Sequence, residues 1–226
     1  MKLWCVILAW VGAMLCSSAQ ALNFLPQRGM YSVPVKSYKE LQFGDVYRQQ
    51  YDFSCGSAAL ASLLTYHYQT PSAEQEIFEV MFSNGDQALI EQQGFSLLDM
   101  KQYLDAQGLR ADGFQISLEK MKQVGVPGVT LVNFDGYLHF VVIKGMNQHS
   151  VILGDPSRGT MMMSFEEFEQ YYQGVVLLIR NKAEVGRASF ITDDHFAVYH
   201  SAPLSTGVSR ESLGVFSITL PEAGEY

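Results

Sequence analysis

Apolar positions follow two different patterns along the chain, and the change comes near Gly125. Before it, apolar side chains recur at helical spacing, which predicts helices at Cys55–Gln69, from Ser72 to Asn84, at Ser96–Gln107 and at Ser117–Val124. After it, short runs rich in Val, Ile, Leu and Phe predict strands at Gly128–Phe134, Leu138–Lys144, Ser150–Leu153 and Gly174–Arg180, with one more helix at Ser164–Tyr172. Helices followed by strands indicate an α+β fold.

Residue types at the helix ends support these assignments. The second helix is expected to start at Ser72, whose hydroxyl can cap it, with Gln75 completing a capping box. Ser164 and Glu167 form the same pattern at the start of the late helix. The helix that begins at Cys55 is rich in Gly, Ala and Ser, which suits a buried helix packed closely on its neighbours.

The two ends of the chain differ from this central region. Residues 1–21 read as a cleaved export signal, because a positive start and an apolar stretch precede the small residues of Ala19–Ala21. A membrane anchor is the alternative, but the stretch is short for a membrane span. Residues 22–45 predict an extended lead-in with one strand at Tyr31–Lys36, and residues 46–180 predict the folded domain. Residues 181–226 form a more polar extension with strand-like runs at Phe190–Tyr199 and Gly214–Leu220.

The amino-acid composition indicates which classes of binding partner are unfavourable for this protein. The 226 residues include 15 Lys and Arg against 23 Asp and Glu, for a net charge of −8. This acidic balance argues against a nucleic-acid ligand, because phosphate backbones require clustered basic side chains. No apolar run of membrane-spanning length follows the export signal, so we expect no stable membrane span after its cleavage.

Cysteine usage becomes informative once the export signal is set aside. Cys5 and Cys16 lie within it, so Cys55 remains alone and cannot form an intramolecular disulfide. An unpaired thiol in an oxidising compartment is expected either to be buried or to have a chemical function. The simpler interpretation is that Cys55 is a small, buried hydrophobic residue. Cys55 stands where a turn becomes a helix, and the unpaired N–H groups at that helix end favour the reactive thiolate. Gly56 beside it would let a substrate carbonyl approach closely.

His139 is the candidate base for this thiol, because it lies inside an apolar strand. Taken alone, such a histidine is more often a buried structural residue. If Gly145–His149 form a five-residue hairpin loop, however, His139 lies directly opposite Asp155, at a distance that permits a hydrogen bond. Cys55, His139 and Asp155 then predict a nucleophile, a base and an orienting carboxylate.

Each of these residues has a defined role in such a site. His139 would take the proton from Cys55 and later protonate the leaving amine, while Asp155 fixes the imidazole tautomer. An amide N–H of Gln49 could stabilise the oxyanion beside the backbone N–H of Cys55. We expect no cofactor and no metal. Asp193, Asp194, His195 and His200 lack a further close ligand, so an ordinary polar segment is favoured there.

Three motifs resemble the bacteriocin-processing cysteine peptidases, a papain-like family that removes leader peptides, commonly after a double glycine. They are Gln-x-x-x-x-x-Cys-Gly-x-Ala-Ala from Gln49, His-Phe-Val-Val from His139 and Gly-Asp-Pro-Ser-x-Gly from Gly154. The resemblance covers about Val46–Ile179 and implies a papain-like fold with the Cys helix packed on an antiparallel sheet. It also favours Gln49 over Gln50 as the oxyanion donor, because the glutamine of the family stands six residues before the cysteine.

The chain departs from many members of that family, in which a membrane transporter is fused to the peptidase. Exported, stand-alone members are similar to the peptidase encoded with functional-amyloid (Fap) fibre systems of Gram-negative bacteria. That resemblance implies a periplasmic location and a protein of the fibre export system as substrate, and it makes double-glycine specificity doubtful. We therefore predict an exported cysteine endopeptidase. The alternatives are an acyl-transferring (transglutaminase-like) or amidase enzyme with the same triad, and a binding or assembly factor on a peptidase scaffold.

Overall fold

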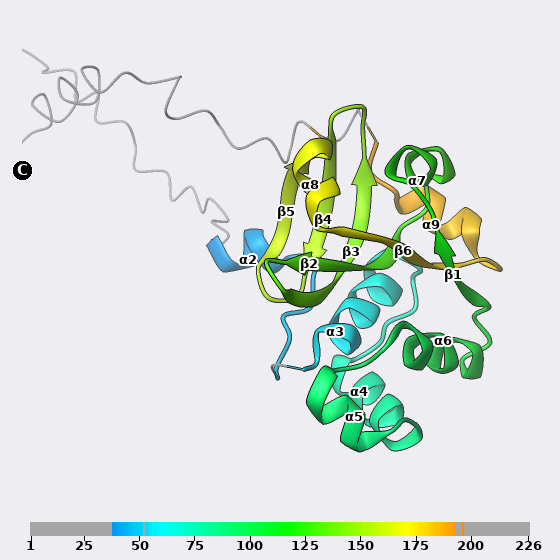
Figure 1. The fold of residues 1–226 in the computed structure, drawn as a ribbon. Helices are drawn as coiled ribbons and strands as arrows, with labels where there is room; N and C mark the ends of the chain where they lie inside the picture. Colours follow the sequence, from blue (N-terminus) through cyan, green and yellow to red (C-terminus); the bar gives the residue numbers. More distant parts are fainter. Residues whose placement is uncertain (1–37, 52, 193–195, 197–226) are drawn as a thin grey trace, which may run out of the picture. The chain divides into compact units, whose positions relative to one another are not determined.

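An antiparallel sheet of six strands lies at the centre of the computed structural model, which describes residues 38–51, 53–192 and 196. The strand order is β1-β6-β2-β3-β4-β5, and every neighbouring pair is antiparallel (Figure 1). The strands are β1 (Ala111–Gln115), β2 (Gly128–Phe134), β3 (Tyr137–Met146), β4 (Ser150–Asp155), β5 (Gly159–Ser164) and β6 (Tyr172–Ile179).

Helices cover both faces of this sheet. Figure 1 shows the group from α3 to α6 below the sheet and α7 and α8 above it. Helix α2 lies against β5, and α9 lies against the π-helical turn η1 that continues α3. The helices are α2 (Tyr38–Phe43), α3 (Cys55–Ser62), η1 (Leu63–His67), α4 (Glu74–Asn84), α5 (Gln87–Gln93), α6 (Leu97–Ala106), α7 (Leu118–Val124), α8 (Phe165–Tyr171) and α9 (Ala183–Ser189).

Alternation along the strands divides the core into two clusters. Leu177 and Ile179 of β6 belong to the cluster formed with α3, α4 and α6. Val176 and Leu178 belong to the second cluster, which includes residues of α7 and α8. Because successive strand side chains point to opposite faces, a strand segment covered on both sides is apolar, as residues 175–179 of β6 show.

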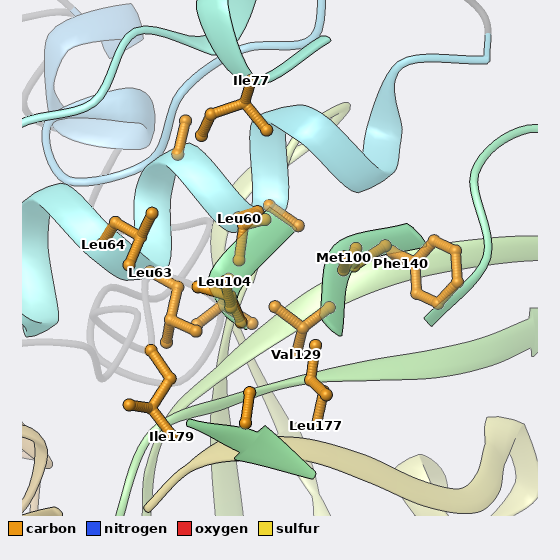
Figure 2. Close-up of a cluster of buried hydrophobic side chains, with 14 of the residues drawn as sticks. Leu60, Leu63, Leu64, Ile77, Met100, Leu104, Val129, Phe140, Leu177 and Ile179 are labelled. Atoms are coloured by element: carbon orange, nitrogen blue, oxygen red, sulfur yellow. The ribbon is translucent and has the colours of Figure 1, made fainter. Parts of the chain in front are cut away.

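Helix α3 is the buried element that the sequence predicted, and each of its residues lies in the core. Figure 2 shows Leu60 of this helix in the cluster with Met100 of α6 and Phe140 of β3. Gly56 also has a packing role, because a Cβ atom there would lie 2.7 Å from Met100 Cε and 3.2 Å from Phe95 Cβ. Its missing side chain therefore permits close packing of α3 in the core.

Several helix ends agree with the sequence, and one does not. Ser96, Ser117 and Ser164 accept hydrogen bonds from the first turns of α6, α7 and α8, as N-caps do. The expected cap at Ser72 is wrong: α4 begins at Glu74 with no side-chain cap, and the Ser72 hydroxyl donates to Thr70 O instead. This local hydrogen bond competes with capping, as is usual for serine near a turn.

The flanking segments contain helices that the sequence did not predict. The lead-in was expected to be extended, but Tyr38–Phe43 form α2, and the run after residue 181 begins with α9. Ile191 adds an isolated bridge to Gly145 of β3. The strand-like runs at Tyr31–Lys36 and Gly214–Leu220, most of Phe190–Tyr199 and residues 1–21 lie outside the described residues. Within the described part, no helix has the length and apolar character needed to cross a membrane.

Candidate active site

Cys55 is the first residue of α3, and its side chain is buried and free of any disulfide. The preceding residue, Ser54, does not cap the helix with its side chain. Backbone N–H groups in the first turn of a helix have no intrahelical partner. The sulfur therefore stands at a helix end whose donors remain available to a developing negative charge.

His139 and Asp155 meet as the sequence predicted. Nε2 of His139 lies 2.8 Å from Oδ1 of Asp155, and the two side chains are 1% and 0% exposed. In an environment from which water is excluded, such a contact is stronger than at the surface. One carboxylate thus holds the imidazole in a single orientation.

The predicted hairpin register is wrong, although the predicted contact between His139 and Asp155 is present. Strand β3 extends to Met146, so the loop to β4 is Asn147–His149, and a bulge lies between Ile143 and Gly145. Val142 pairs with Gly154, which makes His139 and Asp155 diagonal neighbours rather than directly opposed residues. The sequence offers no sign of the bulge, because Ile191, far along the chain, bonds to β3 there through Lys144 O and the Met146 N–H.

Asp155 also shapes the turn that follows β4. Its Oδ1 accepts hydrogen bonds from the Ser157 N–H and hydroxyl, both at 2.7 Å, and from the Arg158 N–H at 3.2 Å. A side-chain oxygen that bonds the N–H two residues on is an Asx turn, for which Asp-Pro-Ser is a recognisable signal. Ser157 is therefore a supporting residue that the sequence analysis missed. Oδ2 of Asp155 is buried with no hydrogen-bond partner among the described residues.

The pKa values of this pair are shifted in opposite directions. Burial acts to lower the pKa of His139, but the hydrogen bond to Asp155, the neighbouring Cys55 and the charges of both raise it from 6.5 to about 9. Burial acts to raise the pKa of Asp155, but the hydrogen bonds and charge of His139, together with Ser157, lower it. At neutral pH the site therefore holds an imidazolium beside a carboxylate.

Cys55 is one of the groups that raise the pKa of His139, so the sulfur is a near neighbour of the imidazole. Nε2 is already bonded to Asp155, so Nδ1 is the nitrogen left for the sulfur. Nδ1 is buried and has no hydrogen bond of ordinary distance and angle in the described part of the chain. Hydrogen bonds at active sites are often long before substrate binds, and this geometry fits a sulfur placed beside the imidazole.

Gln49 lies beside the same turn as Asp155. Its backbone N–H donates to Pro156 O at 3.0 Å, and its side-chain Oε1 is buried without a hydrogen-bond partner among the residues described. Gln50 is exposed, and its backbone N–H donates to Glu74 Oε1. The backbone of Gln49 is thus held at the turn that contains Asp155, and its side-chain oxygen is buried, whereas Gln50 is exposed to solvent.

Other candidate groups do not join this site. His67 is buried with Nδ1 3.0 Å from Ser189 Oγ, and burial, followed by the charge of Lys144, lowers the pKa of His67 to about 4. No group of His, Cys, Asp and Glu in the described ranges could hold a metal ion. The residues weighed for a metal site, Asp193, Asp194, His195 and His200, lie outside those ranges.

A comparison with protein families decides the assignment: the model of the peptidase C39 family matches residues 45–184. The chain belongs to this family. It is 36% identical over 167 residues to the probable functional amyloid protease FapD of Pseudomonas aeruginosa PAO1, covering 73% of this chain and 74% of that protein. The protein of the same name from Pseudomonas fluorescens is also 36% identical, over 76% of this chain and 73% of its own length.

Solved structures support the same assignment. A double glycine motif protease from an AMS/PCAT transporter, crystallised with its leader peptide, is 28% identical with a TM-score of 0.51, over 59% of this chain and 88% of that one. The peptidase domain of Streptococcus ComA, at 20% identity and a TM-score of 0.52, covers 60% of this chain and 96% of its own and shares the fold. The predicted α+β, papain-like fold and the cysteine peptidase class are thus confirmed.

Proposed function

We propose that this peptidase cleaves its substrate through Cys55 as nucleophile, His139 as acid and base, and Asp155 as the residue that orients the imidazole. The observation that carries the proposal is the buried 2.8 Å contact of His139 Nε2 with Asp155 Oδ1. It leaves Nδ1 of the same ring for Cys55, the sulfur that raises the pKa of His139. Nucleophile, base and orienting group in this order are the requirements of covalent peptide hydrolysis.

The reaction follows from these positions. The Cys55 thiolate attacks the scissile carbonyl, and the imidazolium gives its proton to the leaving amine as the C–N bond breaks, which leaves a thioester. The now neutral His139 takes a proton from water, whose oxygen attacks the thioester and releases the acid and the thiolate. The backbone N–H of Cys55 and the amide of Gln49 are the donors we assign to the oxyanion.

The relatives indicate a substrate class. Because two proteins that cover most of this chain are named as probable functional amyloid proteases, we assign this chain to the processing of a protein in a functional-amyloid fibre system. Residues 1–21 would direct it to the periplasm before they are removed.

The test is a comparison of exported proteins from cells that carry the native chain or Cys55→Ala. We expect one protein of the fibre system to keep an additional segment in the Cys55→Ala cells, and mass spectrometry of its new terminus would identify the scissile bond. Identical exported proteins in both cells, with fibres formed equally, would instead support an assembly factor on a peptidase scaffold. Stable incorporation of a labelled amine in place of new termini would support acyl transfer.

A further inference from the structure

Glu74 is a buried acidic residue that the proposed reaction does not use. It is the first residue of α4 and is 6% exposed. A buried carboxylate is costly unless hydrogen bonds compensate for the loss of water. Here Oε1 accepts one hydrogen bond from Ser54 Oγ at 2.8 Å and another from the backbone N–H of Gln50 at 3.3 Å.

The two donors are not scattered along the chain. Ser54 immediately precedes Cys55, and Gln50 immediately follows Gln49. One oxygen of Glu74 therefore joins both ends of the segment whose neighbours are the nucleophile and the oxyanion donor. Bonds to a carboxylate are stronger than those between neutral groups, and the shorter of the two, at 2.8 Å, holds the residue next to Cys55.

Among the described residues of this segment, the direct link between Gln50 and Ser54 is the one made by Glu74. The Gln49 N–H is fixed to Pro156 O, and a turn bond joins the Ser54 N–H to Tyr51 O at 3.1 Å. The turn bond and a second bond, from the Tyr51 N–H to Ser54 Oγ at 3.1 Å, hold Tyr51 against Ser54. The link from Ser54 on to Gln50, the neighbour of Gln49, runs through Glu74. The Ser54 hydroxyl is also 3.0 Å from Tyr51 O, but it has a single proton and lies closer to the charged acceptor.

We propose that Glu74 is a positioning residue that sets the separation between the Gln49 amide and the Cys55 backbone N–H, so that both donate to one oxyanion. This inference rests on the proposed roles of Cys55 and Gln49. An oxyanion forms only during the reaction, so loss of Glu74 should reduce kcat and leave KM nearly unchanged. Alkylation of Cys55 by iodoacetamide forms no oxyanion, so its rate should also change little.

The experiment measures kcat and KM on a synthetic peptide that spans the cleavage site found in the exported proteins. The variants are Glu74→Ala, Gln49→Ala, the double variant and Glu74→Gln, which keeps an acceptor oxygen. Glu76→Ala, an exposed glutamate on the same helix, is the matched control. The iodoacetamide rate and the urea midpoint are measured for each protein, and Ser54→Ala breaks the same link if Glu74→Ala does not fold.

We expect Glu74→Ala to lower kcat by about 10- to 100-fold, the scale of a small misplacement of a catalytic group. In the Gln49→Ala background the same change should cost less than about threefold, because the donor it positions is absent. Glu74→Gln should recover most of kcat, and Glu76→Ala should match the native protein.

Two results would overturn the inference. One is an equal loss of kcat from Glu74→Ala in both backgrounds, and the other is an alkylation rate that falls in parallel with kcat. Either would make Glu74 a residue of general stability. Cleavage that persists in Cys55→Ala would be a failure of the proposed function itself and is scored separately from these variants.

Discussion

Replacing Asp155 with asparagine removes one charge from the site while an oxygen can remain at the position that faces His139. The Oδ1 atom that accepts from His139, Ser157 and Arg158 has an equivalent in the amide. The new NH2 group would take the place of Oδ2, which is buried and has no partner in the described chain. We expect the fold to survive with a loss of about 1–3 kcal/mol, the cost of an unsatisfied buried group.

The larger effect of Asp155→Asn is on the protonation of His139. The pKa of His139 is raised from 6.5 to about 9, which corresponds to about 3 kcal/mol in favour of the imidazolium. Burial acts in the opposite direction, and Cys55 continues to raise the pKa, so without the carboxylate charge the pKa of His139 should fall toward 6.5. In the proposed reaction the imidazolium protonates the leaving amine, so we expect activity in the native protein to decline only as the pH rises through about 9.

The assay is the pH dependence of kcat/KM, together with an NMR titration of the His139 ring identified by its loss in His139→Gln. In Asp155→Asn the alkaline limb should move to lower pH and narrow the active range. Asp135→Asn is the control, because it removes the same charge from the exposed turn of the hairpin that carries His139. An unchanged alkaline limb and an unchanged ring titration in Asp155→Asn would refute the reasoning.

Further predictions concern the thiol, the packing of α9 and acid stability. Iodoacetamide should modify Cys55 rapidly near neutral pH and at least about tenfold more slowly after His139→Ala, and equal rates would remove the support for an activated thiol. Gly186→Ala places a Cβ 2.7 Å from Tyr68 Oη and should lower the free energy of unfolding in urea by about 1–3 kcal/mol, whereas Gly113→Ala, with open space around it, should not. The pKa of His67 is lowered to about 4, so its stabilising effect is complete above pH 6.5 and is lost as the pH falls toward 4. Urea unfolding of the native protein should show this loss, about 3 kcal/mol, and His67→Gln should lack it.

The sequence predicted most strands and helices whose own residues carry the signal. Gly128–Phe134 is a strand with the predicted bounds because a continuous run of apolar and β-branched residues is buried on both faces. β1 was missed because Asp112 and Gly113 are poor strand formers, and the segment becomes a strand through its pairing with β6. α9 was missed for a similar reason, since Gly186 interrupts its pattern and contact with Tyr68 supports it.

The residues of the candidate site also differ in whether the local sequence indicates them. Cys55, His139 and Asp155 could be found because each has a local motif, and the imidazole–carboxylate contact is present despite the wrong register. A shift of two residues keeps both side chains on the same side of the hairpin, so the contact survives the error. Glu74 could not be found, because its importance depends on where α4 meets the loop before Cys55, which no spacing in the sequence records.

The turn after β4 has a consequence for engineering. A single oxygen of Asp155 closes the turn and also aims the imidazole, so an insertion or deletion between residues 155 and 159 would redirect the ring even if the sheet stayed intact. The loop at Asn147–His149, at the opposite end of β4, is closed by Asn147 Oδ1, but that oxygen does not contact His139. Affinity tags, fluorophores or grafted recognition sequences therefore belong at the latter position.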